Sequence, residues 1–159
     1  MEYLKIDGEF PRLSKSAVTL GKFDGIHRGH QKLVEKILEQ KEKGLQTVLF
    51  SLGIGSQMIF TKEERCQLLE KAGVDVLIEC PLDNRIRHMK AETFIKEILV
   101  GDLQAEHVAV GEDSGSGMNA REHHSFWRLW EGSLALLWML FRKKWKAAER
   151  SAVHLSVRN

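Results

Sequence analysis

The sequence predicts an α/β protein built on a doubly wound parallel sheet. Short apolar runs of strand length alternate along the chain with longer segments whose apolar residues recur at helical spacing. The resulting order of strand, helix, strand, helix, strand, helix, strand is typical of parallel strands joined by helical crossovers. With 159 residues, 43% hydrophobic and 29% charged, the chain is long enough for one domain with a sizeable core.

The first unit of this pattern has clear boundaries. Residues 16–20 (SAVTL) predict a short buried strand that ends at Gly21. Apolar residues at helical spacing predict a helix over about 30–43, closed by Gly44. Residues 47–50 (TVLF) predict the second strand, so the chain returns to the sheet after one helix.

Two further units follow. Residues 61–64 (TKEE) have the pattern of a capping box and predict the start of a helix that ends at Gly73. The sequence VDVLIEC predicts a third strand, and KAETFIKEILV predicts a helix ended by Gly101. Residues 107–111 (HVAVG) predict the fourth strand.

Composition limits the compartment and the partners. The N-terminal sequence MEYLKIDGEF has early acidic residues and no apolar segment of a signal peptide. The longest apolar run, residues 134–141, is too short to cross a bilayer. Cys66 and Cys80 lack a metal-ligand pattern and fit a reducing cytoplasm. These observations predict a cytoplasmic protein. The net charge of +2 argues neither for nor against nucleic acid. We assign no metal-ligating residues and expect neither a nucleic-acid nor a membrane partner. The oligomeric state is left open.

The sequence GKFDGIHRGH, residues 21–30, is the strongest functional signal. In a doubly wound sheet, the turn after the first strand opens where ligands bind. Gly21 and Gly25 allow the tight turn, and His27 and His30 then lie one turn apart at the start of the helix. A helix N-terminus attracts anions, and Gly29 lets a phosphate approach the backbone. The pattern therefore predicts a phosphate clamp suited to charge that grows during transfer.

Two other interpretations of the histidines are possible. They could be two exposed residues beside an ordinary helix cap. They could also bind zinc, but helical zinc pairs are usually four residues apart and need further ligands. The strand–turn–helix context favours phosphate binding over both.

The same ten residues resemble the G-x-F-D-G-x-H-x-G-H signature of the FMN adenylyltransferase module of bacterial bifunctional riboflavin kinase/FAD synthetase. The resemblance continues to VAVGED and covers about residues 17–113. It implies a Rossmann-like nucleotidyltransferase fold with a parallel sheet. The C-terminal part, where the resemblance ends, is expected to be irregular. The shorter H-x-G-H pattern is shared with cytidylyltransferases, other adenylyltransferases and class I aminoacyl-tRNA synthetases, so it is less specific.

The resemblance also implies a reaction, ATP + FMN → FAD + pyrophosphate, with Mg²⁺. The FMN phosphate would attack the α-phosphorus of ATP directly, so positioning and charge stabilisation would carry the rate. His27 and His30 would be the catalytic residues that hold the ATP phosphates. Residues implied to shape or border the nucleotide site are Gly21, Phe23, Asp24, Gly25, Gly29, Gly111 and Asp113. The sequence SLGIGSQ stands where many relatives have D-x-H-P, which leaves the flavin contacts unassigned.

Composition changes sharply after Asp113. Residues 114–159 carry eight Lys and Arg against three Glu, and they contain all four tryptophans. The family's F-x-F-G and I-S-S-T-x-I-R elements are missing there. Restoring one base after codon 113 permits F-G-F-G-Y from residues 114–118 and I-S-S-T-F-I-R from residues 150–157. We therefore assign residues 1–113 to the nucleotidyltransferase domain and expect residues 114–159 to be an out-of-frame tail, with activity impaired.

Two rival functions remain open. The tail could be an evolved basic helix that lies on an acidic membrane or a partner groove, making the chain a nucleotide-binding adaptor. The chain could instead be a cytidylyltransferase of the same superfamily, although Phe-Asp-Gly and VGED favour the flavin enzyme. The charges of TKEER are expected on a solvated helix face, and His88 and His107 are expected to be ordinary surface or core residues.

Overall fold

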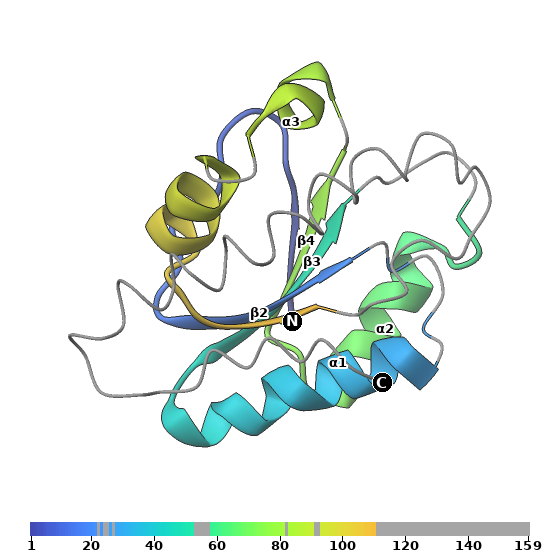
Figure 1. Ribbon diagram of the computed structural model, residues 1–159. Helices are drawn as coiled ribbons and strands as arrows, with labels where there is room; N and C mark the ends of the chain where they lie inside the picture. Colours follow the sequence, from blue (N-terminus) through green and yellow to red (C-terminus); the bar gives the residue numbers. More distant parts are fainter. Residues whose placement is uncertain are drawn as a thin grey trace.

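The computed structural model describes most of the chain before residue 111, namely residues 1–21, 23, 26, 28–52, 58–81, 83–90 and 93–110. Within these ranges the protein has a central sheet with helices on both of its faces (Figure 1). The predicted α/β class with a parallel sheet is confirmed.

The sheet has five strands, and every neighbouring pair is parallel. The spatial order is β1-β4-β3-β2-β5. The strands are β1 (Glu2–Lys5), β2 (Ser16–Gly21), β3 (Gln46–Leu52), β4 (Val76–Cys80) and β5 (Ala105–Val110). All four predicted strands are present, each with boundaries shifted by no more than two residues. The edge strand β1 was not predicted, because four residues with two half-buried positions give no readable periodicity.

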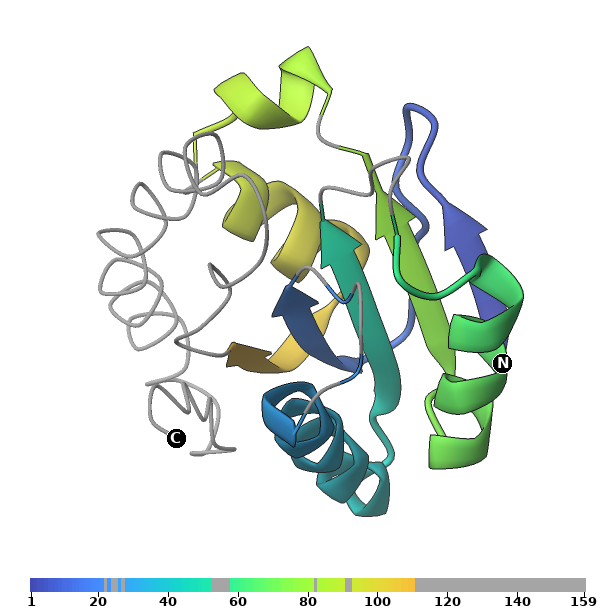
Figure 2. The ribbon, with the colours of Figure 1, turned by 90° about the vertical axis from the view of Figure 1, so that its right-hand side faces the viewer.

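Helices and sheet form three layers. Helices α1 (Arg28–Leu38) and α2 (Lys62–Ala72) cover one face, and α3 (Asn84–His88) and η2 (Phe94–Asp102) cover the other (Figures 1 and 2). A short 3₁₀ segment, η1 (Glu39–Lys43), continues α1. Among the described helices, none combines the length and apolar character needed to cross a membrane.

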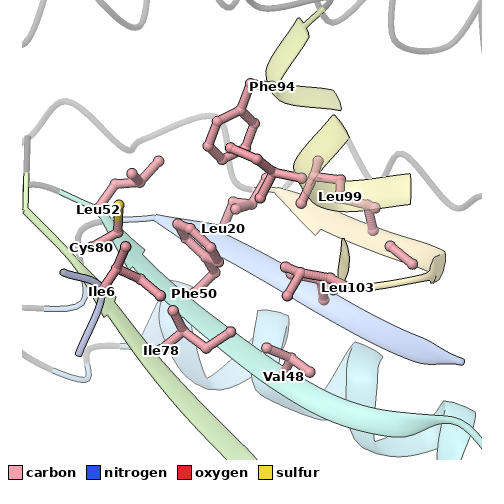
Figure 3. Packing of buried hydrophobic residues seen from close by; sticks show 14 of the residues in the cluster. Ile6, Leu20, Val48, Phe50, Leu52, Ile78, Cys80, Phe94, Leu99 and Leu103 are labelled. Carbon is pink, nitrogen blue, oxygen red and sulfur yellow. The ribbon is translucent and has the colours of Figure 1, made fainter. Parts of the chain in front are cut away.

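Alternate residues of each strand belong to two separate hydrophobic clusters, because successive side chains of a strand point to opposite faces of the sheet. On the α1/α2 face, the strands contribute Ala17, Leu49, Leu77 and Ala109. The opposite cluster is larger. There Phe94 of η2 meets the ring of Phe50 edge-on, with 5.8 Å between the ring centroids (Figure 3). Since both faces are buried, the strands read as continuous apolar runs in the sequence.

The first predicted helix is present at the predicted position, but only part of it is α-helical. It starts at Arg28 rather than at about residue 30, and its α-helical part ends at Leu38. The remaining residues form η1, which ends at Gly44 with φ of 76°. This left-handed conformation is one that glycine adopts without the steric penalty of a side chain, so Gly44 ends the segment as predicted.

The prediction that Gly101 ends a helix is wrong. Helix η2 (Phe94–Asp102) continues through Gly101 to Asp102. Residues 91 and 92, near the predicted start, lie outside the described residues, so the start of this helix stays a prediction. It is a π-helix, and the N–H of Leu103 donates to the carbonyl of Ile98 five residues earlier, at 2.8 Å. A Cβ on residue 101 would lie 3.2 Å from the carbonyl oxygen of Lys96. Glycine here permits a close backbone approach inside the helix instead of ending it.

Candidate active site

The candidate site lies where the order of strands in the sheet reverses. From β2 the chain adds β3 and then β4 on one side, and it later returns to place β5 on the other side of β2. In open parallel sheets, ligands bind at the carboxyl ends of the strands that flank such a point. Gly21 is the last residue of β2, so the signature GKFDGIHRGH leaves the sheet at this position.

Three described residues of the signature pack against one another. The ring of Phe23 is 2% exposed and lies 4.7 Å from the ring of His30, centroid to centroid, at an angle of 55°. A Cβ on Gly21 would lie 3.3 Å from Cε2 of Phe23. Glycine therefore makes room for the Phe23 ring, and the ring in turn supports the imidazole of His30. Phe23 belongs to the buried cluster on the α1 face.

The first turn of α1 places backbone N–H groups at the same end of the sheet. The helix begins at Arg28, so Gly29 and His30 lie in its first turn, and no acidic residue is present in that turn. The free N–H groups and the dipole of a helix N-terminus attract negative charge. With His30 half-buried beside them, this region has the donors that a phosphate group needs.

Five other predicted site residues lie outside the part of the chain that the structure describes. They are Asp24, Gly25, His27, Gly111 and Asp113. The structure therefore brings together Gly21, Phe23, Gly29 and His30, and the arrangement of the other five stays a prediction.

A buried polar network at the same end of the sheet was missed by the sequence analysis. The guanidinium of Arg65, on α2, pairs with Oε1 of Glu79, on β4, and both side chains are almost fully buried. The hydroxyl of Tyr3, on β1, donates to Oε2 of Glu79 at 2.6 Å. The prediction that the charges of TKEER lie on a solvated face is therefore wrong for Arg65. A glutamate within the apolar run VLIEC was the available signal, because a charge inside a buried strand needs a partner.

Two polar atoms near this network have no hydrogen-bond partner within the described structure. They are Oγ of Ser51 and Nε of Arg65, and both residues are less than 5% exposed. Ser51 is the residue of β3 that pairs in register with Gly21 on one side and with Glu79 on the other. Buried polar groups without partners are rare in folded proteins. Here they lie at the carboxyl ends of the strands, where a ligand or water can complete them.

The cysteines at this end do not supply a nucleophile. Burial raises the pKa of Cys80 to about 12, and burial is also the largest cause of the raised pKa of Cys66. Burial likewise raises the pKa of Tyr3, and its hydrogen bond to Glu79 adds to the effect. All three groups are protonated at neutral pH, so neither thiol is a thiolate nucleophile. Tyr3 remains a hydrogen-bond donor.

The described residues do not contain a cluster of three or more His, Cys, Asp or Glu that could hold a metal ion. The parallel sheet, with helices on both faces and a reversal of strand order at β2, has the fold of the Rossmann-like nucleotidyltransferase class.

Comparison with known proteins identifies the family within this class. The family model described as FAD synthetase matches residues 10–131. The chain therefore belongs to the FAD synthetase family. The match begins before residue 17 and extends beyond Asp113, so it is longer than the sequence resemblance had indicated.

Two curated relatives illustrate the similarity. The bifunctional riboflavin kinase/FMN adenylyltransferase of Escherichia coli (strain K12) is 30% identical over 107 residues, which cover 60% of this chain and 34% of that protein. The putative bifunctional riboflavin kinase/FMN adenylyltransferase of Geobacillus thermodenitrificans (strain NG80-2) is 28% identical over 133 residues, 79% of this chain and 68% of that protein. The chain thus spans about one third of the E. coli relative.

Among solved structures, the fold is similar to one titled "Crystal Structure of Macrolide-efflux Protein from Streptococcus pneumoniae". The TM-score is 0.60 with 24% sequence identity, and the match covers 71% of this chain and 43% of the other. At this identity the likeness supports the fold alone.

Proposed function

We propose that this chain carries the FMN adenylyltransferase site of the FAD synthetase family. The reaction transfers the adenylyl group of ATP to FMN and yields FAD and pyrophosphate. An oxygen of the FMN phosphate forms a bond to the α-phosphorus of ATP, and the bond from that phosphorus to the bridging oxygen of pyrophosphate breaks. The electron pair of the broken bond leaves with pyrophosphate, so no covalent enzyme intermediate is required.

One observation carries this proposal. The signature GKFDGIHRGH begins at the carboxyl end of β2, beside the reversal of strand order, and runs into the first turn of α1. That location is where an α/β sheet binds nucleotides. The family match over residues 10–131 supports the flavin reaction over that of a cytidylyltransferase with the same H-x-G-H pattern.

The residues of the signature have separate roles in this proposal. His27 and His30 hold the phosphates of ATP and stabilise the negative charge that develops as pyrophosphate departs. The N–H groups at the start of α1 bind the same phosphates, and Gly29 allows their close approach. Gly21, Phe23, Asp24 and Gly25 shape the turn, and Gly111 and Asp113 border the nucleotide after β5.

Mg²⁺ enters this proposal as part of the substrate MgATP. This ion is commonly bound by substrate phosphates and water together with one or two carboxylates, so a dedicated protein cage is not required. Asp24 and Asp113 are the acidic residues of the predicted site that could approach it. The ion would neutralise part of the negative charge of the ATP phosphates.

We further propose that residues 1–113 form the catalytic domain and that residues 114–159 are translated out of frame. Loss of the F-x-F-G and I-S-S-T-x-I-R elements supports this, together with the change of composition after Asp113. The family match extends to residue 131, into this segment, so the coding DNA is the direct test of the reading frame. On this proposal the chain keeps its phosphate clamp but forms FAD slowly.

The proposed activity is tested by incubating the purified chain with FMN and either ATP or CTP, and separating the products by chromatography. We expect ATP-dependent formation of FAD and pyrophosphate in equal amounts, at a low rate. A larger product yield with CTP than with ATP would contradict the assignment and indicate a cytidylyltransferase. Binding to anionic vesicles without any nucleotidyl transfer would instead support the adaptor function.

A further inference from the structure

Among the described strands, β1 is the shortest and has the least burial. It lies at an edge of the sheet, where it pairs with β4 (Figure 2). Tyr3 and Leu4 are half-buried, whereas Glu2 and Lys5 are exposed. All residues of β4 are buried, so the loss of β1 would uncover a largely apolar strand. An open strand edge of this kind can pair with another chain.

Apolar burial alone does not fix how β1 aligns with β4. Leu4 and Ile6 are two residues apart, and both pack in the same hydrophobic cluster. Because side chains alternate along a strand, a slip of β1 by two residues would place one of them where the other now lies. Apolar contacts on that face therefore discriminate weakly between the observed register, in which Tyr3 pairs with Leu77, and a slipped one.

The network of Tyr3, Arg65 and Glu79 does discriminate between these registers. The hydroxyl of Tyr3 donates to Oε2 of Glu79, two residues beyond its register partner Leu77, at 2.6 Å. A slip by two residues would move the Tyr3 ring about 6.6 Å along the strand and break this hydrogen bond. Glu79 is held in place on the other side, because its Oε1 pairs with Arg65 of α2. Arg65 in turn donates through Nη1 to the carbonyl of Phe60 at 3.1 Å.

The chemistry of the network favours specificity over stability as its role. The side chains of Arg65 and Glu79 are each 5% exposed, and burying an ion pair costs desolvation. Apolar residues of similar volume often stabilise a fold as well or better, whereas a buried polar group can select one alignment among several. Lys62 of α2 adds a contact to the same strand, with its ammonium group 4.0 Å from the centroid of the Tyr3 ring.

We propose that the Tyr3–Glu79–Arg65 network specifies the register of β1 on β4 and so keeps the edge of β4 covered. Helix α2 provides the fixed point, because Arg65 orients the carboxylate that accepts the Tyr3 hydroxyl. Loss of the network therefore loosens β1 while the rest of the sheet stays folded. This role is independent of the proposed reaction, since it concerns the pairing of two strands.

The test separates the specificity of pairing from stability in variants of the full chain. The triple variant Tyr3→Phe/Arg65→Met/Glu79→Leu replaces the polar network with apolar side chains of similar size, so no buried charge is left unpaired. Tyr3→Phe alone removes the hydroxyl and keeps the ring. Glu106→Gln is the matched control, because it breaks an ion pair at β5, on the opposite edge of the sheet.

Amide hydrogen exchange, followed by NMR, reports the pairing of β1 directly. The N–H groups of Glu2 and Ile6 donate to the carbonyls of Asp75 and Glu79, each at 2.9 Å, so these two reporter amides are freed when β1 slips or detaches. The amide of Val48, on the central strand β3, is the reference for unfolding of the whole sheet. Urea unfolding measures the stability of each variant.

For the triple variant we expect a urea midpoint equal to or above that of the unaltered chain. The reporter amides should nevertheless exchange about tenfold faster or more, relative to the reference amide. Tyr3→Phe should show the same selective increase, and Glu106→Gln should show none.

Three results would overturn the inference. One is unchanged exchange of the reporter amides in the triple variant. Another is an increase that the reference amide matches, because a network that only stabilises the fold would change both alike. A triple variant that fails to fold would also overturn it, since stability would then be the role of the network.

Discussion

At the scale of single residues, the packing of Phe23 depends on the absence of a side chain at Gly21. The Phe23 ring leaves too little room for a Cβ at residue 21, and the same ring lies against His30. The tight turn predicted after Gly21 falls mostly on residues outside the described part of the chain and stays a prediction. A side chain at residue 21 would displace the Phe23 ring, and the displaced ring would move the imidazole of His30, which we propose binds the ATP phosphates.

We predict that Gly21→Ala lowers both stability and ATP affinity. Its Cβ would lie 3.3 Å from the buried Phe23 ring, which must shift by a few tenths of an ångström and move His30. Overpacking of this kind costs about 1–3 kcal/mol. Gly44→Ala is the control: residue 44 has open space around its Cβ but φ of 76°, so it should lose stability alone. Urea unfolding and calorimetry measure the two effects, and ATP affinity that falls equally in both variants would contradict the steric link.

We predict that His27→Ala and His30→Ala each slow adenylyl transfer by about 10²–10³-fold in the frame-restored chain, without loss of folding. Removing one donor that stabilises charge in a transition state typically has an effect of this size. His88→Ala is the control, because His88 is exposed and its ring contacts only the carbonyl of Asn84 among the described hydrogen bonds. Initial rates of FAD formation provide the measurement. Rates equal to that of the His88 variant would remove both histidines from the mechanism.

At the scale of elements, the sequence predicts most reliably where burial decides the structure. Strands β2 to β5 are buried on both faces, and their apolar runs show this directly. The capping box at Thr61 is a local signal and is confirmed in detail. The π-helical form of η2 could not be predicted, because it depends on an approach between Gly101 and the Lys96 carbonyl that no periodicity records.

Asp75 joins three elements at the end of the sheet away from the site. Its carboxylate accepts hydrogen bonds from the N–H and hydroxyl of Thr47 and from Lys41, each at 2.9 Å. Burial alone would raise the pKa of Asp75, but the bonds from Thr47 and Lys41 outweigh burial and hold the pKa below 3.8. The ionised form is therefore the one that stabilises the fold, and this contribution is present above pH 3.8.

We accordingly predict that Asp75→Asn lowers the free energy of unfolding near pH 7 by no more than about 1 kcal/mol, since solvent screens this partly exposed pair. Below pH 3.8 the unfolded chain takes up the proton first, and the contribution is lost as the pH falls on through the lower pKa of the folded chain. The difference between the two proteins should then shrink. Urea unfolding at pH 7, 4 and 3 measures it, and a difference that grows toward low pH would contradict the assigned sign.

At the scale of the whole molecule, residues that are far apart in the sequence meet near the carboxyl ends of the strands, where we expect ligands to bind. Tyr3 reaches Glu79 because β1 pairs with β4, and Arg65 reaches the same carboxylate from α2. Sequence patterns could locate the residues predicted to bind phosphate, because these are adjacent in the chain. Glu79 within VLIEC indicated a buried charge that needs a partner, but the sequence could not identify Arg65 and Tyr3 as its partners.

We propose that residues 1–113 carry an adenylyl transfer site that needs the residues encoded in the other reading frame after Asp113. Loss of one charge-stabilising contact in phosphoryl-transfer chemistry costs on the order of 10³-fold in rate. The frame-restored chain should therefore greatly exceed the present chain in activity, even though both contain the same clamp.

The most direct measurement is the rate of FAD formation from FMN and ATP, followed by chromatography, for the present chain and for a version with one base inserted after codon 113. We expect ready FAD formation by the restored version and near-background formation by the present chain. Equal rates would show that residues 114–159 are a functional segment. Absence of FAD from the restored version would contradict the assigned reaction.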